Sequence, residues 1–385
     1  MTKSWLLYFW RRDLVCRFGQ AVSRFTWLVL ALEASSCTNV GSLEDHTPGR
    51  VSVLDSGEPV PDSGEVNPGL RVDPRLASDE WFDGGLGVRV QDLWRSALLA
   101  QSTCFVLESG NLLFNTPTRD RVLQHIILSQ SGQRNVGPPD SDLRVTGLDE
   151  SVSWCKADST GRNVCMKEFS DGGLIRGPDE LVYLYSWTGS GFISGAIRTD
   201  ENAFESVVYY PDGGRLVAPA MVLTEDAVGV GQIRDANGVQ AAVIWRDGQS
   251  YRLENSPSDS SWGAAVNASG LVVGQRFVGN LNSAAVFAAG EARVLPKRYG
   301  HSAELFAVNG SGLAVGQERG ARRAWAVVWY RGATVYLDEV ADAGAGCWFS
   351  NSTSVNGRNE VAATVTCADD TTRCVRVRLG LIMME

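Results

Sequence analysis

The stretch Val266-Asn-Ala-Ser-Gly-Leu-Val-Val-Gly-Gln275 is repeated almost unchanged as Val308-Asn-Gly-Ser-Gly-Leu-Ala-Val-Gly-Gln317. Looser copies begin at Thr224, before these two stretches, and at Val355, after them. Around the stretches, landmark residues recur every 42 or 43 positions: Gly231, Gly274 and Gly316; Trp245, Phe287 and Trp329; Leu253, Leu295 and Leu337. A fixed period of this length is typical of solenoids, propellers and other repeat arrays, and not of an ordinary enzyme domain.

Each unit consists of short apolar runs separated by turn residues. The unit that begins at Leu305 has four such runs of roughly three to seven residues, rich in β-branched and aromatic types and divided by Gly and Asn. It lacks the apolar stripe of period 3.6 that a helix needs. We therefore predict an all-β fold, a β-propeller built from about seven four-stranded antiparallel repeats of about 40 residues each.

The landmark residues have an expected role in such a fold. The glycine near the end of the second strand (Gly231, Gly274, Gly316) indicates close approach of another backbone. The aromatic residue that follows is expected to fill the gap between neighbouring sheets, and the leucine to lie in the core. Fainter units between residues 96 and 220 bring the count to seven. Six or eight blades remain open alternatives.

The repeated phrase resembles the bacterial HAF family of extracellular repeats. Units of that family read roughly as alternating apolar residues, Asn-x-x-Gly-x-Val-Val-Gly, a spacer, His-Ala-Phe-x-Trp and then Leu. The resemblance covers three units, residues 220–340, but Ala241, Ser283 and Trp325 stand where the family has its histidine. It implies a β-rich surface or secreted protein, and it brings no catalytic residues with it.

The N-terminus has the layout of a secretory signal. Basic residues precede the apolar run Phe25-Thr-Trp-Leu-Val-Leu-Ala-Leu32, and small residues lead to Cys37. The run is too short to span a bilayer. The small residues before Cys37 resemble a bacterial lipobox, which implies a signal peptide over residues 1–36 and a lipid anchor on Cys37. Ordinary signal-peptidase cleavage at the same place is the alternative.

The predicted organisation therefore has three parts. Residues 37–90 are rich in Ser, Gly, Pro, Asp and Glu and are expected to form a flexible tether, because they cannot bury enough apolar surface to fold. Residues 91–385 form the repeat domain. We expect an exported protein of the bacterial outer membrane, cell surface or periplasm, in contact with the membrane through its lipid anchor.

Six of the eight cysteines lie in the predicted repeat domain. Two pairs, Cys155 with Cys165 and Cys367 with Cys374, bracket hairpin turns, where facing side chains can bridge. Cys104 and Cys347 fall in the first and last units, so we predict a bond between them that closes the ring. Six cysteines allow 15 pairings, and sequence alone does not choose among them. Three disulfides require an oxidising compartment, and the spacing of the cysteines does not fit a zinc site.

The sequence indicates no catalytic residues, no metal site and no cofactor. His125, in the apolar run from Leu123 to Ile127, is expected to be a core or edge residue, and neither it nor His301 lies in a nucleophile or metal motif. A net charge of −9 argues against nucleic acid as a partner. Arg376 and Arg378 alternate with valine, which places them on the outward face of a predicted strand.

Three functions remain. The first is a monomeric envelope propeller that binds an unknown protein or glycan, for which we expect an exposed aromatic or apolar patch. The second is a propeller hydrolase or lyase, for which carboxylates should converge on the ring axis. The third is a structural or adhesive envelope protein without a small ligand. The sequence favours the first without naming the ligand.

Overall fold

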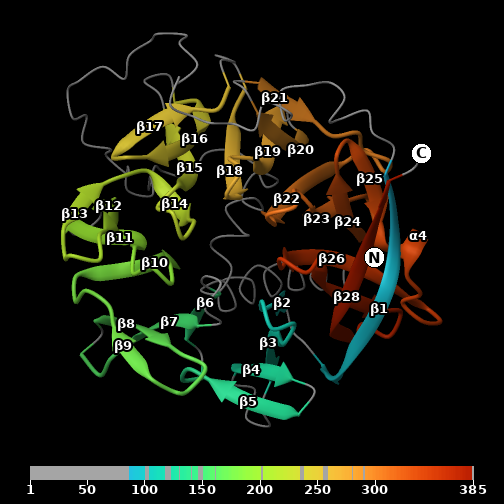
Figure 1. The fold of residues 1–385 in the computed structure, drawn as a ribbon, viewed down its shortest axis with the longest axis horizontal. Coiled ribbons are helices and arrows are strands. Elements are labelled where there is room, and N and C mark those ends of the chain that lie inside the picture. Colours follow the sequence, from blue (N-terminus) through green and yellow to red (C-terminus); the bar gives the residue numbers. More distant parts are fainter. Residues whose placement is uncertain are drawn as a thin grey trace, which may run out of the picture. The chain divides into compact units, whose positions relative to one another are not determined.

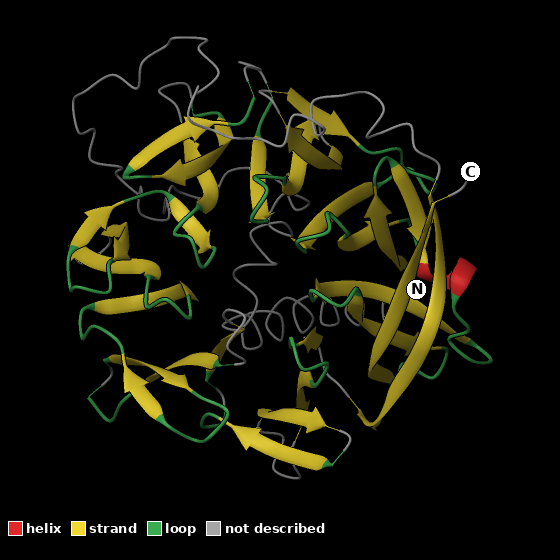
Figure 2. Cartoon of the chain, in the orientation of Figure 1, coloured by secondary structure: helices red, strands yellow, loops and turns green. Residues whose placement is uncertain are grey.

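The computed structural model describes most of the predicted repeat domain, in the following ranges: residues 86–99, 104–117, 123–129, 131–139, 141–145, 151–160, 162–200, 203–234, 238–254, 259–279, 281–288 and 291–383. The predicted signal segment, Cys37 and most of the predicted tether lie outside these residues. The described chain is almost entirely strand, with one short helix, α4 (Leu337–Val340) (Figure 2). No described helix is long and apolar enough to cross a membrane.

The strands form seven four-stranded antiparallel sheets around a common centre, which is the predicted seven-bladed β-propeller (Figure 1). Blades 1 to 3 contain, in chain order, β2 (Cys104–Val106), β3 (Leu112–Pro117), β4 (Leu123–Ser129) and β5 (Gly132–Val136); β6 (Asp142–Val145), β7 (Val152–Ala157), β8 (Asn163–Glu168) and β9 (Leu174–Arg176); β10 (Leu181–Trp187), β11 (Ile193–Asp200), β12 (Ala203–Tyr209) and β13 (Arg215–Val217). Blades 4 to 6 contain β14 (Ala220–Leu223), β15 (Gly229–Arg234), β16 (Gln240–Arg246) and β17 (Gln249–Arg252); β18 (Ser261–Val266), β19 (Val272–Val278), β20 (Leu281–Ala288) and β21 (Glu291–Val294); β22 (Ser302–Val308), β23 (Ala314–Arg319), β24 (Ala324–Tyr330) and β25 (Ala333–Tyr336).

Blade 7 combines the two ends of the described chain. Its inner strands are β26 (Cys347–Val355), β27 (Glu360–Cys367) and β28 (Thr372–Met383), and its outermost strand is β1 (Leu86–Leu99). β1 pairs antiparallel with β28, from Leu86 opposite Met383 to Leu99 opposite Arg373. The predicted boundary of the repeat domain, at residue 91, falls inside β1. The N-terminal strand therefore completes the last blade.

Apolar residues from adjacent blades form a separate cluster at each of the seven junctions. The repeated aromatic residue from the third strand of a blade faces the preceding blade. Trp245 packs beside Val208 of blade 3, Phe287 beside Val230 of blade 4, and Trp329 beside Val273 of blade 5. All three aromatic side chains are buried, and so are Leu253, Leu295 and Leu337. Burying one such aromatic side chain contributes roughly 1.5–3 kcal/mol relative to leaving it exposed.

The repeated glycine of the second strand lies against the inner strand of its own blade. A Cβ at Gly316 would lie 1.9 Å from the carbonyl oxygen of Glu304, and one at Gly274 would lie 2.0 Å from that of Trp262. In both blades the pairing register shifts at this point, so the inner strand bulges toward the glycine. Gly231 pairs with Ala220 beside a similar shift in blade 4. The other backbone expected near these glycines is therefore the inner strand of the same sheet.

The structure contains three disulfides, and two of the three predicted pairings are wrong. Cys155–Cys165 bridges β7 and β8, as predicted. Cys367 bonds to Cys347, which faces it directly on β26 with their Cα atoms 3.9 Å apart. Cys374 bonds to Cys104 of blade 1 instead of to Cys367. A disulfide therefore joins the first and last blades, as predicted, but Cys104 is bonded to Cys374 and not to Cys347.

We predict that removing this closing bond destabilises the domain more than removing a hairpin bond. In the chain-entropy model a bond spanning 270 residues contributes about 5–6 kcal/mol, and one spanning 10 residues contributes about 2.7 kcal/mol. Urea unfolding followed by tryptophan fluorescence should therefore show a larger loss for Cys104→Ala/Cys374→Ala than for Cys155→Ala/Cys165→Ala. All four cysteine side chains are buried, so the two double variants lose similar packing contacts. Equal losses would contradict the closing role.

A second prediction concerns Gly316. Gly316→Ala should destabilise the domain by about 2–3 kcal/mol, because the new methyl group overlaps the carbonyl oxygen of Glu304. Gly310→Ala is the control, since a Cβ there meets no atom within 4 Å. Its effect should stay within about 0.5 kcal/mol. Urea unfolding measures both variants, and a Gly316→Ala variant as stable as the wild type would contradict the predicted overlap with Glu304.

Candidate functional site

The repeated phrase forms the turn between the first and second strands of a blade. In blade 6 the backbone N–H of Asn309 donates to the carbonyl of Leu313, and the N–H of Gly312 donates back to the carbonyl of Asn309. Gly312 has a φ of 84°, which explains the glycine at the fifth position of the phrase. The Asn309 Oδ1 accepts the N–H groups of Ser311 and Leu313 at 3.1 and 3.0 Å. Asn267 makes the same contacts in blade 5.

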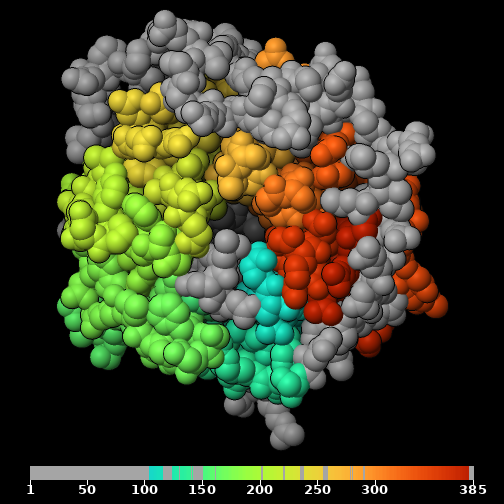
Figure 3. Space-filling model, in the orientation of Figure 1, coloured from blue at the N-terminus to red at the C-terminus, as the bar shows by residue number. Residues whose placement is uncertain are grey.

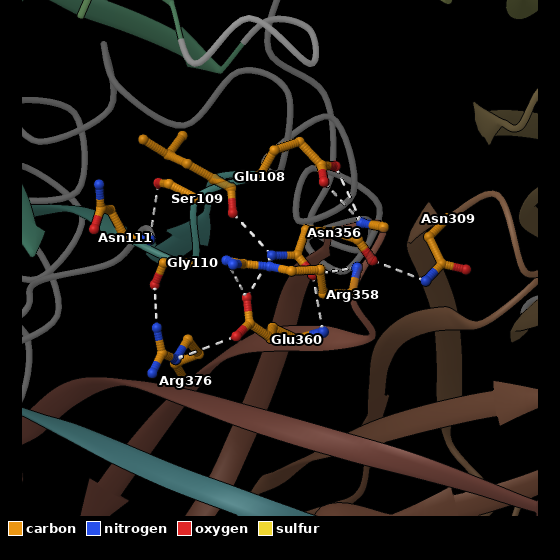
Figure 4. A network of polar contacts seen from close by, with 11 residues as sticks. Glu108, Ser109, Gly110, Asn111, Asn309, Asn356, Arg358, Glu360 and Arg376 are labelled. Carbon is orange, nitrogen blue, oxygen red and sulfur yellow. Dashed lines mark hydrogen bonds and ion pairs between the residues drawn. The ribbon is translucent and has the colours of Figure 1, made fainter.

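The asparagine of each turn also reaches the neighbouring blade. The Nδ2 of Asn267 donates to the carbonyl of Asn309 at 2.9 Å, and that of Asn309 donates to the carbonyl of Asn356 at 2.8 Å. Asn356 in turn donates to the carbonyl of Leu107 at 2.9 Å, across the junction between blades 7 and 1 (Figure 4). We refer to these three side chains, all buried, as the asparagine ladder. The sequence reading treated them as turn residues only.

Charged residues strengthen the junction between blades 7 and 1. The Glu108 carboxylate accepts the N–H of Gly357, and Arg376 donates to the carbonyl of Gly110 at 2.7 Å (Figure 4). Glu360 lies between them and accepts from Arg358 at 2.8 Å. The predicted outward position of Arg376 is wrong, because the residue is only 8% exposed. Its strand meets the first blade, and the guanidinium is buried at that contact.

Carboxylates of the described inner turns hold blades together. Glu225 of blade 4 accepts the N–H groups of Gly189 and Ser190 of blade 3, each at 2.8 Å. Glu108 and Glu360 make comparable contacts between or within turns. Figure 3 shows a hollow near the centre of the ring on one face. Among the described residues there is no group of three His, Cys, Asp or Glu side chains that could hold a metal. His125 is buried and hydrogen-bonded to Asn115 and to the carbonyl of Ser141.

A row of aromatic and arginine side chains extends from blade 5 to blade 7. Tyr299 stacks on Trp325 with ring centroids 3.7 Å apart. Arg323 lies 5.0 Å from the ring of Trp325 and 5.5 Å from that of Trp348, so one guanidinium lies near both indoles. We call these four residues the aromatic row. Arginine near indole rings is held by cation–π attraction.

Glu318 fixes one end of the aromatic row. Its buried carboxylate accepts the backbone N–H groups of Arg298 and Gly300, each at 3.1 Å, and the hydroxyl of Tyr336. Burial and the neighbouring carboxylate both raise the pKa of Tyr336, so this hydroxyl stays protonated and donates. The segment that carries Tyr299 is therefore held in place before any ligand arrives.

The other end of the aromatic row opens into a cavity of about 560 Å³. Trp348 and Arg323 line it together with three carboxylate residues, Asp338, Glu339 and Asp342. The carboxyl group of Asp338 is partly buried, which raises its pKa, although the N–H of Phe349 donates to it at 3.0 Å. The cavity is a broad depression that is open to solvent. We take this cavity as the candidate site and refer to it as the Trp348 cavity.

The sequence contained only weak signals of this site. Trp325 stands where the family pattern has histidine, and Trp348 belongs to none of the repeated landmarks. α4 and residues 341–346 follow β25 and have no counterpart in the repeated phrase. The cavity forms where blades 6 and 7 meet, so its residues come together only in the folded ring.

Comparison with known proteins shows the fold alone. No family model and no curated protein matches the sequence. The β-propeller domain of the Trilobed protease from Pyrococcus furiosus, which has an open velcro topology, matches with a TM-score of 0.54 and 9% identity, over 75% of this chain and 98% of that domain. Acylaminoacyl peptidase from Pyrococcus horikoshii matches with a TM-score of 0.50 and 10% identity, over 72% of this chain and 52% of the peptidase. TolB from Acinetobacter baumannii has a TM-score of 0.40 and 13% identity, over 72% and 66% of the two chains.

We predict that Asn309→Asp destabilises the domain by about 1–3 kcal/mol, because the carboxylate retains the accepting oxygen but cannot donate to Asn356. Asn309→Ala should cost more, since it also leaves the N–H groups of its own turn without their acceptor. Thr224→Ala in blade 4 is the control, because its hydroxyl accepts the N–H of Val228 within its own turn. Urea unfolding should rank the losses in the order Asn309→Ala, Asn309→Asp, Thr224→Ala, and a different order would contradict the ladder.

Proposed function

We propose that this chain is an exported glycan-binding propeller and that a sugar unit occupies the Trp348 cavity. The observation that carries the proposal is the meeting of the aromatic row with three carboxylate residues at one cavity. Of the three functions that the sequence left open, binding fits best, because the partly exposed Trp348 stands beside polar groups in one cavity.

A sugar ring matches this combination of groups. Its faces present C–H groups, which the negative face of an indole attracts, and its edge presents hydroxyl groups. Carboxylates accept hydrogen bonds from hydroxyls, and a guanidinium donates to the ring or linkage oxygens. The cavity lining contains each of these partners: the indole of Trp348, the guanidinium of Arg323, and the carboxylates of Asp338 and Asp342. A pocket in which polar groups fix orientation beside an aromatic surface is typical of selective small-ligand sites.

Charge makes a phosphate-rich ligand a poorer fit. Three carboxylate residues line the cavity against one arginine. Glu339 is already paired with Arg298, so Arg323 is the one basic residue in the cavity lining and it faces Asp338 and Asp342. A phosphate group would meet Asp338 and Asp342 at close range and be repelled. A neutral or amine-bearing sugar avoids this cost.

The cellular setting is part of the proposal. The three disulfides support an extracellular or periplasmic location, because such bonds persist in oxidising compartments. We further propose that Cys37 carries the lipid anchor and that the domain acts as a monomer held near the membrane. A glycan of the cell envelope would then lie within reach of the cavity.

We predict that Trp348→Ala lowers glycan affinity at least tenfold while leaving the domain folded. The measurement is a glycan-array screen with the wild-type protein, followed by calorimetric titration of the sugars that bind. Tyr183→Ala is the matched control, since Tyr183 is an aromatic residue 47% exposed on blade 3, distant in sequence from the cavity. Wild-type protein that binds no sugar, or a Trp348→Ala variant that binds as well as Tyr183→Ala, would overturn the proposal.

A further inference from the structure

A second cavity adjoins the Trp348 cavity. It has a volume of about 400 Å³ and shares Ala343 and Cys347 with the first as common wall residues. Its polar lining comes from blade 7, where Asp369 and Thr371 lie in the turn between β27 and β28 and Arg373 lies near the start of β28. One short segment, residues 341–347, therefore lines both cavities, and we call it the partition.

The partition is fixed at both ends and in its interior. The N–H of Ala341 donates to the carbonyl of Leu337 in α4, and the carbonyl of Gly346 accepts the N–H of Ala368 from blade 7, each at 2.9 Å. The disulfide Cys347–Cys367 ties the same end to β27. Gly344 and Gly346 have positive φ angles of 101° and 71°, a conformation that other residues rarely adopt. A wall held in this way retains its shape without a ligand, which reduces the entropy cost of binding.

The second cavity offers the same kind of chemistry as the first. The Asp369 carboxylate accepts the hydroxyl and the N–H of Thr371, and its remaining lone pairs suit a ligand hydroxyl. Arg373 is exposed beside it and supplies N–H donors. One acid and one base leave this cavity close to neutral, whereas the Trp348 cavity carries an excess of acid. Neither charge pattern requires a charged sugar.

We infer that the two cavities are adjoining subsites for one oligosaccharide of two or more sugar units, with the chain crossing the partition. This inference rests on the proposed function and adds the length of the ligand to it. Two linked subsites bind a linked ligand more tightly than either binds a single unit, because the second contact becomes intramolecular. Ala345 is exposed and small, so a chain that crosses the partition meets little side-chain bulk there.

The test compares sugars of different length on three variants. Calorimetric titration would use glucose, mannose and N-acetylglucosamine, each as the monosaccharide and as its linear trisaccharide. The variants are Trp348→Ala in the first cavity, Arg373→Ala in the second, and Arg378→Ala as the control. Arg378 is an exposed arginine on the same strand as Arg373 and lines neither cavity.

In the wild type we expect at least one trisaccharide to bind tenfold or more tightly than its monosaccharide. Arg373→Ala should lower the trisaccharide affinity about fivefold and leave the monosaccharide affinity unchanged, whereas Trp348→Ala should weaken both. A monosaccharide that binds as tightly as its trisaccharide, or an Arg373→Ala variant that matches Arg378→Ala, would overturn the inference and leave the single-site proposal standing. Absence of binding to every sugar would instead remove the proposed function itself, and the inference with it.

Discussion

Every blade depends on its two neighbours, because a four-stranded sheet with apolar residues on both faces cannot cover either face by itself. The seven junction clusters show how this requirement is met, with side chains such as Trp329 and Phe287 fully buried between blades. A closed ring leaves no blade with an uncovered face. The junction between the last and first blades must therefore be as secure as the other six. At that place the chain adds the Cys104–Cys374 bond and the buried Arg376.

The repeated phrase adds hydrogen bonds between blades to this apolar packing. One asparagine side chain satisfies the N–H groups of its own turn and donates to the carbonyl of the next turn, so a single residue shapes a blade and joins it to its neighbour. An asparagine offers an acceptor and two donors on one short side chain, which few other residues can replace. Where Thr224 takes this position, the hydroxyl satisfies its own turn, and the neighbouring Glu225 contacts the preceding blade 3.

The features predicted correctly from the sequence are those that local pattern determines. Short apolar runs, turn glycines and the recurring aromatic predicted four strands to a blade and the side chains between blades. β1 was missed because an outer strand carries no repeated phrase, and its partner β28 lies at the other end of the chain. The disulfides failed for a related reason. Cys367 lies on β27 with a strand on each side, so short spacing favoured Cys374 although Cys347 is the residue directly opposite. Strand order in the folded sheet, and not distance along the chain, decides such a choice.

The candidate site follows from the same division between repeated and unrepeated residues. Glycine, asparagine and aromatic residues of the repeat are buried in contacts that hold the ring together, so they have little surface to offer a ligand. Trp348 and the partition depart from the repeat and lie where blades 6 and 7 meet. The regular blades hold these irregular residues in place, through Glu318 at one end and the Cys347–Cys367 bond at the other. A ligand site of fixed shape can then form from residues that match no sequence motif, because the rigid blades hold those residues in position.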